Sequence, residues 1–227
     1  MLEDQSVEET LPARIPIFPL GGVLLLPNAR LPLNIFEPRY LDMTRDAMAG
    51  DRVIGMVQPS PRDLSDERPA IYGIGGAGRI TTFQETEENR LEITLTGLSR
   101  FTIVEELSVT TRYRQVIADW DCYAADRWGE DEIAGIDRTR LLTALRAYLD
   151  LAEIPADWDS IVKAETGRLI TSLAMICPFS PAEKQALLEA HDLFERSRIM
   201  TALVEMSLLH RAGGGGENQY DDSHKIH

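Results

Sequence analysis

Cysteine and lysine are scarce in this sequence, and each shortage excludes a class of chemistry. The chain has 2 cysteines among 227 residues. Cys122 and Cys177 are too far apart in sequence to form a C-x-x-C motif or a disulfide framework. A P-loop for nucleotides requires a lysine directly after a glycine, and Lys163, Lys184 and Lys225 each follow another residue. We therefore expect no ATP-hydrolysing site.

Histidine is scarce as well, and its positions give no pattern typical of a metal site. The 4 histidines include His224 and His227, which lie close to the C-terminus, while His191 and His210 are far apart in sequence. Zinc sites need three or four convergent ligands, usually with a close pair from one element. The sequence therefore predicts neither a bound metal nor a cofactor.

Positive charge is also scarce. There are 23 Lys and Arg residues against 37 Asp and Glu residues, which gives a net charge of -14, and no run of basic residues offsets it. Such a chain repels phosphate backbones and anionic lipids. Long apolar runs and the apolar stretch of a secretory signal are also missing. We expect a cytoplasmic protein that binds neither nucleic acid nor membrane.

One motif points toward nucleotide chemistry, because Gly73, Gly75 and Gly78 satisfy G-x-G-x-x-G. That pattern binds a dinucleotide only where a helix follows the glycines. Here the chain continues through alternating apolar residues such as Leu91 and Ile93, after a polar break at 85–90. This period of two predicts a β-hairpin. We interpret the glycines as strand positions that need a bulge or the close approach of another backbone.

The first half of the chain is predicted to be rich in β-strands. Short apolar runs broken by Pro, Gly and Asn fill residues 14–36, and further strands are expected at 53–58 and on to about residue 118. One helix interrupts them, beginning at Pro38 and ending at Gly50. Short strands with such breaks favour a closed or nearly closed sheet over a parallel βαβ layout.

The second half is predicted to be helical. Apolar residues at helical spacing indicate helices ending before Pro155, around 158–164, through Leu169, Leu173 and Ile176, and near 192–210. Ser180-Pro181-Ala182-Glu183 is typical of a capping box that begins another helix. The fold class is thus α+β, with a β-rich subdomain at 13–120, a helical bundle at 129–211 and a flexible tail at 212–227.

Two arrangements are candidates for a catalytic site. Ser160 and Lys163 fit S-x-x-K, but the companion S-D-N and K-T-G motifs are missing, and Asp157 and Asp159 would keep the lysine charged. The second arrangement is a thiol-imidazole pair of Cys177 and His191. Cys177 precedes a proline at the end of an apolar helix, however, which indicates that its side chain packs in the core. We expect that the protein is not an enzyme, and a hydrolase built on Ser160 is the third hypothesis.

Three segments resemble the substrate-binding N-terminal domain of the Lon protease family. They are "IPIFPLGGVLLLPNARLPLNIFEPRYLDM", "RLEITLTGLSRFTIVEE" and "PFSPAEKQALLEAHDLFERSRIMTALVEM", and the likeness extends from about residue 14 to 210. The resemblance implies a β-rich, PUA-like pseudobarrel followed by a helical bundle. It also implies binding of unfolded or tagged polypeptide. The ATPase and peptidase modules of that family have no counterpart in this sequence, so no residue inherits their catalytic roles.

The function expected from these observations is a stand-alone, non-catalytic module that binds peptides or proteins. It would act as an adaptor, decoy or regulator in proteolysis or protein quality control, with Lon protease itself as a candidate partner. The alternative is a PUA-like module that binds RNA, against which the net charge of -14 counts. Oligomeric state stays open.

A binding surface is predicted around Phe36, Tyr40 and Met43. The helix that begins at Pro38 must cover part of the sheet, and we expect Tyr40, Thr44, Ala47 and Met48 to form the covered face. Met43 is turned away from much of that face at 3.6 residues per turn. We therefore expect Met43 to be at least partly exposed and available to a partner.

Overall fold

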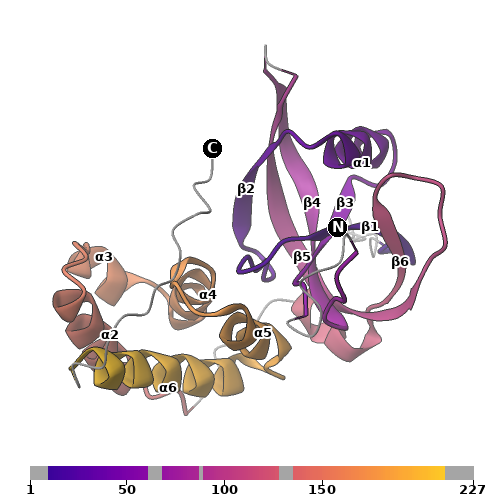
Figure 1. The fold of residues 1–227 in the computed structure, drawn as a ribbon. Helices are drawn as coiled ribbons and strands as arrows, with labels where there is room; N and C mark the ends of the chain where they lie inside the picture. Colours follow the sequence, from indigo (N-terminus) through magenta and orange to yellow (C-terminus); the bar gives the residue numbers. More distant parts are fainter. Residues whose placement is uncertain (1–9, 61–67, 87–88, 128–134, 213–227) are drawn as a thin grey trace, which may run out of the picture.

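The computed structural model describes residues 10–60, 68–86, 89–127 and 135–212. The sheet and the helices of the second half of the chain lie side by side (Figure 1). The strands are β1 (Arg14–Pro19), β2 (Arg30–Ile35), β3 (Val53–Val57), β4 (Ile74–Glu85), β5 (Leu91–Glu106) and β6 (Arg114–Asp119). Together with the helices they form a mixed six-stranded α+β fold, so the predicted fold class is confirmed.

The sheet closes on itself through its longest strand. Its order is β2-β5-β4-β3-β1-β6, and β5 pairs additionally with β6. The first part of β5 pairs with β2 and its last part with β6, so five strands form a ring and β2 lies outside it. The predicted hairpin is confirmed as the β4–β5 pair.

The prediction of a closed or nearly closed sheet is confirmed, and among the described residues its strands pair antiparallel except in one place. There β1 and β3 run parallel, with Ile17 opposite Gly55. A parallel pair needs a long connection that returns the chain to the same end of the sheet. Here β2 and helix α1 (Pro38–Ala49) provide it. Helix α1 begins at Pro38 and has Gly50 as its C-cap, both as predicted.

The glycines of the G-x-G-x-x-G pattern lie within or directly before β4, and Gly76 shows why small residues are needed there. A Cβ on Gly76 would lie 1.8 Å from the carbonyl oxygen of Leu25, and one on Gly97 in β5 would lie 2.0 Å from that of Leu26. A register shift also falls between Ala77 and Gly78. The interpretation is thus confirmed for two of the three glycines, because a Cβ on Gly75 would lie 2.7 Å from the carbonyl oxygen of Met56 and the register shift adjoins Gly78, whereas a Cβ on Gly73 would have no atom within 4 Å.

The second half of the chain is helical, as predicted. After a 3-10 helix η1 (Asp121–Arg127), which we did not predict, follow α2 (Arg138–Leu151), α3 (Trp158–Lys163), α4 (Thr166–Ile176), α5 (Pro181–Glu189) and α6 (Leu193–Ala212). The capping box at the start of α5 is confirmed, because the Ser180 side chain accepts from the Glu183 N–H and the Glu183 carboxylate accepts from the Ser180 N–H.

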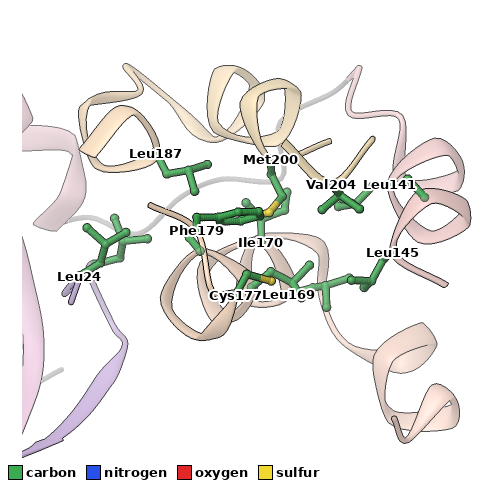
Figure 2. Close-up of a cluster of buried hydrophobic side chains, with 14 of the residues drawn as sticks. Leu24, Leu141, Leu145, Leu169, Ile170, Cys177, Phe179, Leu187, Met200 and Val204 are labelled. Carbon is green, nitrogen blue, oxygen red and sulfur yellow. The ribbon is translucent and has the colours of Figure 1, made fainter. Parts of the chain in front are cut away.

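Residues 24–26 join the core of the sheet to the core of the helices. Leu25 packs in the core of the sheet with Met43, whereas Leu24 and Leu26 belong to the helical core. Figure 2 shows Leu24 at the edge of that cluster, with Phe179, Leu187 and the residues of α4 and α6 beyond it. The segment before β2 is therefore held between sheet and helices.

A buried ion pair makes a second connection. Arg100 in β5 donates from Nε and Nη2 to the two oxygens of Asp126 in η1, at 2.9 and 2.8 Å, and both side chains are almost fully buried. The same guanidinium donates from Nη1 to the carbonyl oxygens of Leu188 and Ala190 at the end of α5. Because these contacts span sheet, η1 and helical bundle, they fix the bundle against the sheet.

The predicted division at residues 120–129 falls between β6, which ends at Asp119, and α2, which begins at Arg138. Whether the halves can be treated as separate subdomains stays a prediction. The predicted flexible tail falls outside the described residues apart from Ala212.

Candidate functional site

Strand β2 is an edge strand of the sheet that can accept another strand. It pairs with β5 from Arg30 opposite Thr96 to Ile35 opposite Leu91. Within the described ranges, no strand pairs with its other edge. An edge strand presents unpaired backbone N–H and C=O groups, and Pro32 at this position is typical of an edge. Strand β2 therefore has a free backbone edge.

A cleft adjoins the beginning of β2. It has a volume of about 680 Å³ and is lined on one side by residues 27–30 and on the other by α4. Figure 1 shows β2 on the side of the sheet nearest to α4. The α4 face that lines the cleft extends from Gly167 to Ile176, which is about 14 Å at 1.5 Å per residue. That length accommodates about four residues of extended chain.

The cleft changes in character along α4. At the helix beginning, Arg168 pairs with Glu165 at 3.2 Å. Thr171 and Ser172 line the middle, and Met175 and Ile176 line the end. Ile176 is 75% exposed although it is a large apolar residue. The cleft therefore offers apolar contact at one end and hydrogen-bonding side chains along its length.

Two further features lie at the other end of β2. Phe36 follows the strand directly and is 55% exposed. The side-chain oxygen of Asn34 is buried and has no hydrogen-bond partner in the part of the chain that the structure describes. We use the name β2–α4 surface for the β2 edge, Phe36 and the cleft. The role of Phe36 in binding stays a prediction.

Tyr40 does not belong to the β2–α4 surface. Its ring is nearly buried, packs 4.0 Å from the ring of Phe18 and has the Arg39 guanidinium 4.6 Å from its centre. Burial raises the pKa of its phenol. Tyr40 lines a second cavity, between α1 and the segment before β6. Its predicted position on the covered face of α1 is confirmed, and its role in binding stays a prediction.

The prediction that Met43 is exposed was wrong, because its side chain is 0% exposed. On an α-helix Met43 lies only about 60° from Tyr40 and about 40° from Ala47. The buried face of α1 is wide enough to include Leu41 on one side and Met43 on the other. The spacing of three from Tyr40 and four from Ala47 could have indicated this. Met43 belongs to the core of the sheet, and its buried side chain cannot contact a partner.

Sequence reasoning also missed the importance of Ile176. The spacing from Leu169 and Leu173 predicted a shared apolar face, but only Leu169 and Leu173 are buried. Helix α4 ends at Ile176, and the backbone becomes extended at Cys177. Cys177 and Phe179 then fill the core, where burial raises the pKa of the Cys177 thiol to about 11. The change of direction leaves Ile176 facing the cleft.

The side chains predicted as catalytic candidates are arranged for capping and packing. Ser160 donates from its hydroxyl to Asp157 at 2.6 Å, and this hydrogen bond lowers the pKa of Asp157, the N-cap residue of α3. Lys163 is exposed, and His191 is 90% exposed while Cys177 is buried. Within the described ranges, no three His, Cys, Asp or Glu side chains are grouped to hold a metal ion, and no helix is long and apolar enough to cross a membrane.

Comparison with protein families gives one match over nearly the whole described chain. Residues 14–205 match the ATP-dependent protease La (LON) substrate-binding domain. Lon protease 2 of Myxococcus xanthus is 27% identical over 201 residues, and Lon protease of Flavobacterium johnsoniae is 26% identical over 198 residues. These alignments cover 87% and 86% of this chain but 24% of each relative. The chain thus spans about a quarter of the length of the curated relatives it matches.

Solved structures show the same fold. A Lon N-terminal domain protein from Xanthomonas campestris superposes with a TM-score of 0.59 at 23% identity, covering 83% of this chain and 97% of that one. The N-terminal domain of the Mycobacterium avium complex Lon protease gives 0.55 at 17% identity, covering 84% and 97%. With the family match over residues 14–205, these findings establish that the chain belongs to the LON substrate-binding domain family.

Proposed function

We propose that this chain is a non-catalytic module that captures unfolded polypeptide on the β2–α4 surface. The observation that carries the proposal is the free backbone edge of β2 beside a cleft. An extended peptide can add to such an edge through main-chain hydrogen bonds, while its side chains enter neighbouring pockets. Ile176 and Met175 would contact apolar side chains of the captured segment, and Phe36 would contact those at the other end of β2.

The family supports polypeptide as the ligand, because the matching model describes a substrate-binding domain of a protease. An adaptor or regulatory role in proteolysis, with Lon protease as a partner, is part of the proposal. RNA is less favoured because the net charge is -14 and no aromatic side chain is among the described residues that line the cleft. Single-strand binders use aromatic platforms on which the bases stack.

Replacing Ile176 with aspartate tests the cleft. Because Ile176 is 75% exposed, the variant should keep the stability of the parent protein. Its affinity for a permanently unfolded polypeptide, such as a reduced and alkylated protein, should fall by about tenfold as an apolar contact is lost. The measurement is a fluorescence anisotropy titration, accompanied by a thermal melt.

Leu209 offers a matched control, since it is an apolar residue that is 72% exposed on α6, outside the β2–α4 surface. Leu209→Asp introduces the same charge and should leave the affinity unchanged. Equal losses in the two variants would show a general charge effect, and unchanged affinity in Ile176→Asp would remove the cleft from the proposal. Retention of cellular RNA at low salt, without binding of polypeptide, would favour the RNA alternative.

A further inference from the structure

The second cavity has walls rich in arginine. Its volume is about 830 Å³, and it lies between the end of β1, the beginning of α1 and the segment before β6. Arg39, Arg68, Arg112 and Arg114 line it, and no carboxylate is among its described lining residues. In a chain with a net charge of -14, four arginines around one cavity concentrate guanidinium N–H donors there, and Glu37, Asp42 and Glu106 beside the cavity pair with three of them.

Carboxylates beside the cavity pair with three of these arginines and use different numbers of their N–H donors. Arg114 donates from Nε and Nη2 to Glu106 and from Nη1 to the carbonyl oxygen of Pro69, so each of its three nitrogens is already engaged. Arg39 directs Nε and Nη2 at one oxygen of Glu37. Arg112 lies 3.7 Å from Asp42, and its side chain is 71% exposed. Since a guanidinium has five N–H donors, Arg39 and Arg112 can each bind a further acceptor.

Two aromatic residues of the cavity, Tyr40 and Tyr113, contact the neighbouring charged side chains and carry no negative charge themselves. The Arg39 guanidinium stacks over the Tyr40 ring, which restricts its position. The Tyr113 hydroxyl donates to Asp46 at 2.7 Å. Burial, together with this hydrogen bond to Asp46, raises the pKa of Tyr113 to about 12, so the phenol stays neutral at physiological pH. The cavity therefore presents preformed N–H donors of Arg39 and Arg112 that Glu37 and Asp42 leave unused.

We propose that this cavity binds a carboxylate of the captured polypeptide, either an Asp or Glu side chain or the C-terminal carboxylate. Arginine forks match the planar geometry of a carboxylate. A long polyanion such as nucleic acid would extend from the cavity into the negative field of the remaining surface, whereas a single carboxylate fits inside. The inference rests on the proposed function, and it adds a preference for acidic segments.

Three peptides of 12 residues without folded structure test the inference. The first carries two glutamates and an amidated C-terminus, the second has glutamines at those positions, and the third is the glutamine peptide with a free C-terminal carboxylate. The protein should bind the first or the third about five- to tenfold more tightly than the second, because charge-assisted hydrogen bonds are gained. The difference should shrink at high salt.

The double variant Arg39→Gln/Arg112→Gln should lose this preference while keeping its melting temperature, since both side chains are substantially exposed. Arg198→Gln on α6 removes the same kind of charge from an exposed position outside the cavity and should keep the preference. Equal binding of all three peptides, or a preference that survives in the double variant, overturns the inference but leaves polypeptide capture intact. Failure to bind any of the three overturns both.

Discussion

Replacing Gly76 with alanine is expected to lower the free energy of unfolding by about 3 kcal/mol or more. The added Cβ would lie 1.8 Å from the carbonyl oxygen of Leu25, and a backbone atom cannot rotate away as a side chain can. Relief requires residues 24–26 to move away from β4. Because Leu24 and Leu26 also pack in the helical core, the substitution should disturb the packing of both cores. Urea unfolding measures the loss.

Gly73 is the matched control for this substitution. It belongs to the same G-x-G-x-x-G pattern, but a Cβ there would have no atom within 4 Å. Gly73→Ala should leave stability unchanged or raise it by about 0.5 kcal/mol, because the unfolded chain loses conformational freedom. A stable Gly76→Ala variant would contradict the close approach of the two backbones. Similar losses in both variants would show that backbone approach at Gly76 is not the cause of the loss in Gly76→Ala.

Replacing Asp126 with alanine is expected to cost about 3–5 kcal/mol, because it leaves the Arg100 guanidinium buried without its counter-charge. The backbone N–H of Arg100 also loses an acceptor, since it donates to Asp126 at 2.9 Å. The remaining hydrogen bonds of Arg100, to carbonyl oxygens at the end of α5, do not neutralise the charge. Thermal and urea unfolding should both register the loss.

An exposed pair with similar geometry separates burial from ion pairing as the cause. Arg140 and Glu205 form two hydrogen bonds, at 2.7 and 2.8 Å, across α2 and α6. Their side chains are 62% and 33% exposed, so water screens the pair. Glu205→Ala should therefore change stability little. If Asp126→Ala is equally mild, the buried pair is not what fixes the helical bundle against the sheet.

Local signals in the sequence were enough for most of the secondary structure. The alternation after residue 90 predicted the β4–β5 hairpin, and Ser180 with Glu183 predicted the start of α5, because a period or a cap involves residues close in sequence. The wide buried face of α1 was missed, and Met43 was misplaced as a result.

The candidate site depended on contacts between distant residues and could not be predicted. The free edge of β2 results from strand pairing, and the cleft results from packing of α4 beside residues 27–30. Arg100 and Asp126 lie 26 residues apart, and nothing in their local sequence marks them as a pair. Phe36 alone was named in advance and is exposed beside the β2 edge. The family resemblance suggested the type of ligand, and the place proposed for it rests on the structure.

Unfolded polypeptide is expected to bind along β2 and α4. Backbone hydrogen exchange of the protein with and without a reduced and alkylated polypeptide tests this binding mode most directly, because an added strand pairs with free N–H groups of β2. We predict slower exchange in residues 28–36 and at the end of α4, with unchanged exchange in α6. Protection that leaves residues 28–36 unaffected while the polypeptide is bound would contradict capture on the β2–α4 surface.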